Sequence, residues 1–414
     1  MISYNKISGL AAAYGSPFYL LHHHSFLDNY HRISAAFRHH YDKLIIGYSY
    51  KTNYIPYLCQ LIKSAGGYAE VVSRMEYELA LKIGQNPRKI IFNGPVKLFE
   101  DIECALLNNS MINLDSWGEI EHIQNCAQKH PQRQINLGLR INMGLSDSLG
   151  KSHRQNQLKI GRFGFSPDPA NLKKIITALN NYDNINIVSL HGHSSTSDRS
   201  LWGFEVIADT LCNVAENYLP DSIDFINVGG GMFGYIPPEM QWTETPTFEE
   251  YAQAICNVLK ANPWFNNKKP HLVIEPGVAL AANALSFITK VIGTKTINDL
   301  LFVTVDGSAC NTKPTFHSIN QAHKIIQASA ADKKACFNVV GSTCMEKDYL
   351  LNDVTDNMPQ IGDYFMIENV GAYTVVLTPP FINVAPAIIT EKNGDFFPVR
   401  HRQTFDNMFA PYIF

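Results

Sequence analysis

Between residues 44 and 275 the chain alternates between short apolar runs rich in strand-forming residues and longer stretches with helical spacing of apolar side chains. Such alternation indicates a parallel sheet whose strands are joined by helices. Eight units of this total length are typical of a (β/α)8 barrel, and we predict that fold; a doubly wound open sheet is the alternative that the pattern leaves open. The strand-like runs are residues 44–51, 68–72, 89–93, 111–115, 135–141, 187–191, 224–228 and 272–275.

The last third of the chain has a different texture. After residue 284 helical patterns become sparse, and short β-rich runs bounded by turn residues recur, which is typical of a small all-β domain. These runs are Leu300–Val305, Phe337–Val340, Tyr364–Ile367 and Tyr373–Leu377. We therefore predict a barrel over residues 25–283 and an all-β domain over residues 284–414. Residues 1–24 carry one further strand, Pro17–Leu21.

Composition and charge argue against several classes of protein. The 414 residues have a formal net charge of −3, which favours neither nucleic acid nor an anionic membrane as a partner. No apolar run reaches the roughly 18 residues of a membrane span, and we see no signal-peptide pattern. Eight cysteines without a C-x-x-C pair indicate reduced thiols and a cytoplasmic protein. Three consecutive histidines, residues 22–24, predict a solvated turn, and we predict no metal site.

The first barrel strand ends on a lysine, Lys51. A lysine at the carboxyl end of a buried strand is poorly solvated, which lowers its pKa and frees its lone pair for chemistry at a carbonyl carbon. The alternative is a lysine that simply leaves the core for solvent. The other strand ends favour the first interpretation, because chemistry in such barrels lies at the carboxyl ends of the strands. Those ends carry Glu70, Asn93, Arg140, His191 with His193, Gly229–Gly231, and Glu275.

This set of residues matches the parts of one cofactor. The triglycine offers backbone N–H groups after the seventh strand, where such barrels commonly bind phosphate. Lys51 offers an amine, His193 a flat ring and Glu275 a buried carboxylate. Phosphate, aldehyde, aromatic ring and ring nitrogen together describe pyridoxal 5′-phosphate (PLP).

Several motifs, in order along nearly the whole chain, carry a resemblance to a known family. They are Tyr48–Lys51, Glu70–Glu76, Arg162–Gly164, Leu190–His193, Asn227–Gly231, Glu275–Gly277, Val305–Gly307, Cys344 with Asp348, and Gly371–Tyr373. With these motifs the sequence resembles the PLP-dependent decarboxylases of the alanine racemase fold (fold type III), the family of ornithine and diaminopimelate decarboxylases. The resemblance implies a PLP-binding barrel, a β domain completed by the N-terminal strand, and a head-to-tail homodimer with shared active sites.

The resemblance also implies roles for individual residues. Lys51 would bind the cofactor through a Schiff base, His193 would stack on its ring, and Glu275 would pair with its ring nitrogen. By this resemblance, a carboxylate at that nitrogen favours a decarboxylase over a racemase, because the racemases of this fold have an arginine there. The partner subunit's Cys344 would protonate the carbanion after carbon dioxide leaves. The remaining implied cofactor contacts are Gly229, Gly230, Gly231, Thr196, Tyr373 and Arg140.

Two positions depart from the family pattern. Val278 replaces the arginine of a Glu-Pro-Gly-Arg motif, and Met345 replaces an acidic residue that helps hold the far amine of a diamino substrate. A free ammonium buried without that acid would be unfavourable. Similar departures occur in the siderophore-pathway branch of the family, so we predict an N-citryl-linked ornithine or diaminopropionate as substrate.

Basic residues of the polar interval 144–168 are candidate partners for the citryl carboxylates: Arg162, Arg154 and Lys151. An alternative is that Asp348 or Glu346 binds a free amine, which would make free ornithine, lysine or diaminopimelate the substrate. A non-catalytic regulator is a further alternative, but such a protein would be expected to have lost Lys51 or Cys344. Both are present.

Overall fold

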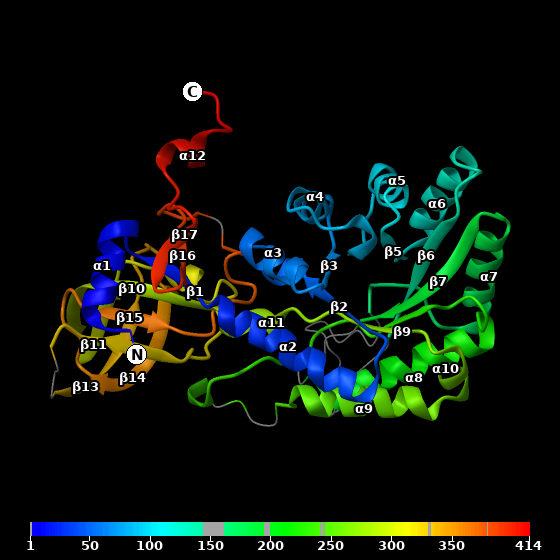
Figure 1. Ribbon diagram of the computed structural model, residues 1–414. Helices are drawn as coiled ribbons and strands as arrows, with labels where there is room; N and C mark the ends of the chain where they lie inside the picture. Colours follow the sequence, from blue (N-terminus) through cyan, green and yellow to red (C-terminus); the bar gives the residue numbers. More distant parts are fainter. Residues whose placement is uncertain are drawn as a thin grey trace. The chain divides into compact units, whose positions relative to one another are not determined.

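The computed structural model describes residues 2–143, 161–193, 199–240, 242, 245–329, 333–378 and 380–414. Its internal contacts divide the chain into two compact units (Figure 1). The barrel unit comprises Leu27–Phe233 and Glu244–Leu280, and the β unit comprises Met1–Phe26, Gly234–Thr243 and Ala281–Phe414. The sequence predicts a barrel over residues 25–283. Within that range, the contacts assign the segment Gly234–Thr243 to the β unit.

Eight parallel strands form the closed barrel that the sequence pattern predicts. Neighbours in the chain are neighbours in the barrel, and β9 closes it by pairing with β2, where Leu44 lies opposite Leu272. The open-sheet alternative is therefore excluded. The strands are β2 (Leu44–Ser49), β3 (Tyr68–Val71), β4 (Ile90–Phe92), β5 (Met111–Leu114), β6 (Ile135–Ile141), β7 (Ile185–Gly192), β8 (Phe225–Asn227) and β9 (His271–Ile274).

Helices connect successive barrel strands (Figure 1). Side-chain caps mark the starts of several of them: Ser73 accepts the N–H of Glu76 at α4, and Thr247 and Glu250 form a reciprocal capping box at α9. The helices are α2 (His23–His40), α3 (Pro56–Ser64), α4 (Arg74–Lys82), α5 (Phe99–Leu107), α6 (Trp117–Lys129), α7 (Pro169–Asn180), α8 (Leu201–Tyr218), α9 (Phe248–Ala261), α10 (Pro263–Lys268) and α11 (Val278–Ala281). No helix in these described ranges is long and apolar enough to cross a membrane.

The β unit is a nine-stranded mixed sheet that contains the N-terminal strand. β1 (Phe18–Leu21) pairs antiparallel with β10 (Leu285–Ile297) and parallel with β16 (Ala387–Lys392). Apolar residues of these strands pack with α1 (Tyr4–Tyr14), so both ends of the chain build one core. The other elements are β11 (Leu300–Val305), β12 (His323–Ile326), β13 (Lys334–Val340), β14 (Tyr349–Asn357), β15 (Tyr364–Ile367), β17 (Asp395–Arg400) and α12 (Phe405–Phe409).

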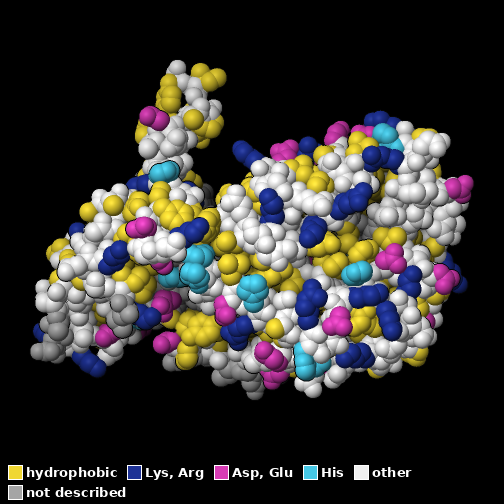
Figure 2. Space-filling model, in the orientation of Figure 1, with side chains coloured by type: hydrophobic (Ala, Val, Ile, Leu, Met, Phe, Trp, Pro, Cys, Tyr) yellow, Lys and Arg dark blue, Asp and Glu magenta, His cyan; other side chains and the backbone are white. Residues whose placement is uncertain are grey.

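Hydrophobic side chains crowd the C-terminal segment (Figure 2). Phe405, Tyr412, Ile413 and Phe414 are all more than half exposed. The rings of Phe405, Tyr412 and Phe414 each lie close to that of Phe409, so the segment forms a small aromatic cluster of its own.

One strand expected from sequence is a turn. The run Tyr373–Leu377 has the composition of a strand, but Tyr373 has a φ of +54°, in the left-handed region. The N–H of Leu377 then donates to the carbonyl of Thr374 at 3.1 Å, as does the hydroxyl of Thr378 at 2.7 Å. These local hydrogen bonds replace a sheet ladder, and composition alone does not reveal them.

The solvated turn expected at the three histidines is also wrong. α2 begins at His23, and two of the three side chains contact the sheet: His22 Nε2 lies 2.9 Å from Ser286 Oγ, and His23 Nδ1 lies 3.2 Å from Thr390 Oγ1. Both partners are hundreds of residues away in sequence, so local patterning could not identify them. Among the residues that the structure describes, no group of three or more metal-ligating side chains is arranged to hold an ion.

Candidate active site

Lys51 lies in a short 3-10 turn, Tyr50–Thr52, directly after β2 rather than at the end of the strand itself. Its Nζ is 2.7 Å from Oε2 of Glu70, a β3 residue whose side chain is fully buried, whereas the Lys51 side chain is 34% exposed. The hydroxyl of Ser49 donates to the same carboxylate oxygen at 2.6 Å. The barrel thus holds a solvent-accessible amine against an inaccessible carboxylate.

Side-chain amides connect this pair to Glu275. Asn93, which follows β4, donates from Nδ2 to Oε1 of Glu70 at 3.0 Å and to Oε1 of Glu275 at 2.8 Å. Asn227 at the end of β8 donates to the same Glu275 oxygen at 2.6 Å. Asn113 of β5 donates to Oδ1 of Asn93 at 2.8 Å. All of these side chains are buried, so the carboxyl ends of five strands share one hydrogen-bonded network.

The charges around Glu275 keep it ionised. Burial alone would raise the pKa of this carboxyl, but His191, Lys51 and the hydrogen bond from Asn227 together hold its pKa well below the usual range. Oε1 accepts both amide hydrogen bonds, and Oε2 lies 3.4 Å from Nε2 of His191. The site therefore presents a fixed negative charge inside the barrel.

The glycines after β8 pack against His193 and Glu275. Gly229 and Gly231 have φ angles of +70° and +110°, and a Cβ on Gly230 would lie 2.0 Å from the carbonyl oxygen of Glu275. No larger residue fits at Gly230, because its backbone packs directly against that of Glu275. The N–H of Gly229 donates to Oδ1 of Asn227 at 2.9 Å. The N–H of Gly230 donates to Nδ1 of His193 at 3.2 Å.

His193 is a neutral ring at ordinary pH. Burial, then the positive charges of Lys51 and Arg140, lower its pKa to about 3. Because Nδ1 accepts from Gly230, the ring proton is on Nε2. A flat uncharged ring beside the glycine segment suits stacking on an aromatic ligand.

Arg140 and Arg162 meet at one aromatic ring. The guanidinium carbons of Arg140 and Arg162 lie 4.6 Å and 4.3 Å from the ring centre of Phe163. Arg140 is buried and pairs with Asp115 at 3.1 Å, while its Nε has no hydrogen-bond partner among the described residues. Arg162 is exposed. Thr196, Lys151 and Arg154 lie outside the described residues.

The other candidates belong to the β unit. Cys344, Met345 and Asp348 line one groove of about 500 Å3, together with residues of β10, β11 and the start of β14. Cys344 is exposed. Asp348 is buried, and its carboxylate accepts hydrogen bonds from Ser308, Thr343 and the N–H of Ala309. Both of its oxygens therefore hold loops together, which favours a structural role over the substrate contact expected from sequence. Tyr373 lies in the turn described above.

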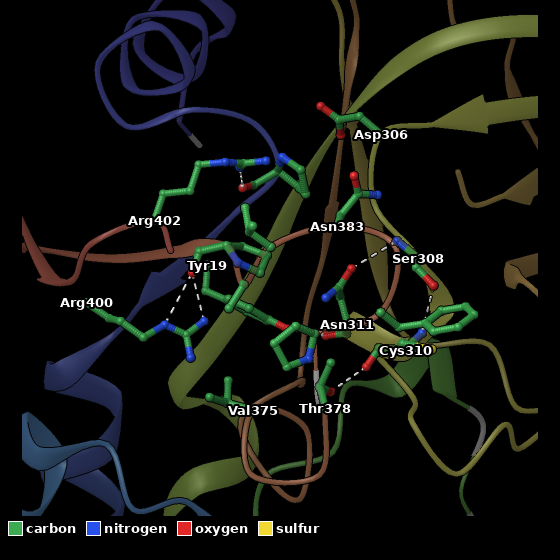
Figure 3. A pocket seen from close by; sticks show the side chains of 16 residues that line it. Tyr19, Asp306, Ser308, Cys310, Asn311, Val375, Thr378, Asn383, Arg400 and Arg402 are labelled. Carbon is green, nitrogen blue, oxygen red and sulfur yellow. Dashed lines mark hydrogen bonds between the residues drawn. The ribbon is translucent and has the colours of Figure 1, made fainter. Parts of the chain in front are cut away.

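A second, smaller cavity of the β unit contains none of the residues expected at the site (Figure 3). Two arginines line it, but each donates to backbone carbonyls: Arg400 to Pro386, and Arg402 to Ser16 and Pro17. Its volume is about 40 Å3, room for water rather than a cofactor.

Sequence reasoning found Lys51, Glu70, Arg140 and Glu275 but missed Asp115, Ser49 and Asn113, and assigned no role to Asn227. Asn113 and Asn227 are polar residues in short, otherwise apolar buried strands. A lone amide in a buried strand needs a partner, and that signal could have identified both.

Comparison with known proteins identifies the family. Residues 27–282 match the pyridoxal-dependent decarboxylase, pyridoxal binding domain. This match spans more than half of the chain. The chain belongs to the pyridoxal-dependent decarboxylase family. It is therefore an enzyme that uses PLP, as the sequence predicted, and its barrel with a separate β unit is the fold expected for this family.

Individual relatives of this decarboxylase are distant but nearly full length. The diaminopimelate decarboxylase of Methanocaldococcus jannaschii is 27% identical over 419 residues, which cover 98% of this chain and 92% of that protein. That of Helicobacter pylori strain J99 is 29% identical over 370 residues, 88% and 87% of the two chains. The crystal structure of diaminopimelate decarboxylase from M. jannaschii superposes on this chain with a TM-score of 0.86 at 25% identity, and the alignment covers 98% of this chain and 94% of that one.

The barrel residues of the decarboxylase fit PLP. An accessible lysine amine suits its aldehyde, the ionised Glu275 suits a protonated ring nitrogen, and the neutral ring of His193 suits its aromatic face. The glycine segment directly after β8, the seventh strand of the barrel, lies where such barrels commonly bind phosphate.

Proposed function

We propose that this decarboxylase removes the α-carboxylate of a diamino acid, with Lys51, His193 and Glu275 as the residues that bind and tune PLP. The observation that carries the proposal is the network in which one amide joins the carboxylate beside Lys51 to the buried carboxylate of Glu275. PLP, when bound, supplies an electron sink for the pair left behind as carbon dioxide departs.

In this proposal the residues of the barrel have distinct tasks. Glu275 holds a proton on the ring nitrogen, because its carboxylate stays ionised. Glu70 orients the Lys51 amine through their 2.7 Å contact. Gly229–Gly231, Thr196 and Tyr373 are the candidate phosphate contacts, and Arg140 supplies a positive charge at the pocket.

A free diamino acid is the first substrate to test. The relatives described above are named diaminopimelate decarboxylases, and this supports a free substrate better than the N-citryl-linked one predicted from sequence. We therefore give diaminopimelate precedence, followed by ornithine and lysine.

The citryl conjugates remain the second candidate because of two observations on the Cys344 loop. Met345 takes the place of the family's acidic residue, and the Asp348 carboxylate is already occupied by Ser308, Ala309 and Thr343. A free distal ammonium would then need another counter-charge, for which the exposed Glu346 is a candidate. An acylated distal nitrogen carries no charge and needs none.

We also propose that the enzyme acts as a homodimer in which the partner subunit's Cys344 completes each site. The exposed Cys344 lies in an open groove of the β unit, as expected of a residue that meets another surface.

The deciding experiment follows carbon dioxide loss by mass spectrometry for diaminopimelate, ornithine, lysine, N-citryl-ornithine and N-citryl-diaminopropionate, with Lys51→Ala as the blank. We expect one free diamino acid to exceed both conjugates by at least roughly tenfold in kcat/KM, about 1.4 kcal/mol of transition-state discrimination. A preference for a conjugate would move the assignment to the second candidate. No turnover of any of the five by PLP-loaded protein would refute the diamino-acid proposal.

A further inference from the structure

Asn93 contacts two buried carboxylates with a single nitrogen. Its Nδ2 donates to Glu70 at 3.0 Å and to Glu275 at 2.8 Å, using both amide hydrogens. Its Oδ1 accepts from Asn113. The reverse orientation would point an oxygen at two carboxylate oxygens and a hydrogen at a donor, so the network fixes which way the amide lies.

The network depends on a glycine that lies beside Asn113. A Cβ on Gly138 of β6 would lie 1.9 Å from Oδ1 of Asn113, so the absence of a side chain there makes room for the residue that orients Asn93. Asn93 and Asn113 are 3% and 1% exposed. Water therefore does not compete for these hydrogen bonds, and each contributes fully to the electrostatics of the site.

An amide is the suitable group between two negative charges. Glu70 and Glu275 are like charges in a buried region, so the two carboxylates repel each other. A neutral donor that binds both carboxylates offsets this repulsion without adding a charge of its own. Among the described residues, the titratable groups that interact with one or other of them include Lys51 after β2, Glu76 on α4, and His191 and His193 at the end of β7.

We propose that Asn93 is a positioning residue that holds the carboxylates of Glu70 and Glu275 in register with each other, so that the lysine partner and the ring-nitrogen partner of PLP are set by one amide. The inference rests on the proposed roles of Lys51 and Glu275. It concerns cofactor binding and makes no assumption about the substrate.

The test titrates cofactor-free protein with PLP across a pH series from about pH 5 to pH 9, where perturbed carboxyl groups and histidines titrate. The dissociation constant is read from the absorbance of bound cofactor. In Asn93→Ala, we expect the dissociation constant for PLP to rise about tenfold, since each carboxylate has lost a charge-assisted hydrogen bond that holds it in place. Asn93→Asp keeps the shape but adds a third carboxyl group, so we expect its affinity for PLP to fall as the pH rises and this group ionises.

Asn227→Ala is the matched control, because Asn227 donates to Glu275 but not to Glu70 in the described network. The rise in its dissociation constant for PLP should be smaller than that of Asn93→Ala. Asn113→Ala leaves Asn93 in place and removes only the donor that orients it, so an intermediate rise is expected even where Asn93→Ala folds poorly.

Two results would overturn the inference. One is a dissociation constant within about twofold of the wild type in Asn93→Ala, together with an unchanged pH profile in Asn93→Asp and circular dichroism showing an intact fold; Asn93 would then be only structural. The other is an equal rise in Asn227→Ala, which would mean that the contact with Glu275 alone accounts for the effect. A rise as expected in a protein that decarboxylates none of the five candidate substrates would support the role of Asn93 while refuting the substrate assignment.

Discussion

The barrel unit and the β unit present their functional residues in opposite ways. In the barrel, Glu70, Asn93 and Glu275 are buried and hydrogen-bonded to one another, and only the Lys51 side chain is partly exposed. In the β unit, Cys344 is exposed in an open groove, and the buried residue of its loop, Asp348, is occupied with holding that loop. The barrel residues are therefore preorganised by their hydrogen bonds, whereas Cys344 is accessible. Substitutions in the barrel should therefore have the larger effects.

The largest effect is expected from removing the lysine. Lys51→Ala should lower kcat by at least about a thousandfold, as the loss of a covalent catalytic group does. Borohydride treatment of the wild type should fix the pyridoxyl group to Lys51, located by peptide mapping, and Lys51→Ala should retain no label. Lys173→Ala, an exposed lysine on α7, is the control that should behave like the wild type. A label on another lysine would contradict the site assignment.

Glu275→Gln should come next. The substitution keeps the size of the side chain but removes the negative charge and places an amide beside the donors of Asn93 and Asn227. We expect kcat to fall on the order of 100–1,000-fold, the range for losing one electrostatic stabiliser of a developing charge. PLP should still attach to Lys51, as borohydride fixation would show. A near-normal kcat would mean that Glu275 does not serve the ring nitrogen.

In the β unit, Cys344→Ala should lower kcat by about a hundredfold, as expected for the loss of a general acid, and should leave the affinity for PLP unchanged. Cys336→Ala, another exposed cysteine of the β unit, should have no effect. Mixing Lys51→Ala with Cys344→Ala protomers should restore activity, because one site of each mixed dimer regains both residues. If labelled subunits exchange without restoring activity, each chain builds its own site.

The smallest expected effect is on stability and concerns Glu76, a buried carboxyl near the Lys51–Glu70 pair. Burial raises its pKa to about 7 from a usual 4.5, despite a 2.7 Å hydrogen bond from the N–H of Val72. The folded state therefore binds this proton more tightly than the unfolded state, and the associated stability is present below the unfolded pKa and lost as the pH rises through about 7. Relative to Glu76→Gln, the wild type should lose roughly 1–3 kcal/mol of unfolding free energy between about pH 5 and pH 8 in urea titrations. Parallel pH profiles for the two proteins would contradict a raised pKa.

The barrel unit and the β unit also differ in how much of their structure could be predicted from the sequence. The barrel follows from local pattern, because apolar strands and capped helices recur in order, and its chemistry follows from which residues end the strands. The β unit depends on pairings such as β1 with β16, which join residues more than 360 positions apart. α1 went unpredicted and Tyr373–Leu377 was read as a strand, because contacts distant in sequence and a left-handed tyrosine carry no periodic signal. In the barrel site, most of the missed residues were uncharged, because an amide that connects two charges is less conspicuous in an apolar strand than a charge is; Asp115, the partner of Arg140, was missed as well.

The position of Asn93 also has a consequence for how this enzyme ages. The residue that follows is Gly94, and an Asn-Gly dipeptide is the sequence most prone to spontaneous deamidation, in which the next backbone nitrogen attacks the side-chain carbonyl. Here that side chain is buried and held by three hydrogen bonds, so the attack geometry is restricted while the barrel stays folded. Partial unfolding would remove this restriction, and the resulting aspartate would set a third carboxyl group between Glu70 and Glu275. Stored protein should therefore lose PLP affinity in step with a one-dalton mass gain at residue 93, and deamidation of exposed asparagines should have no such effect.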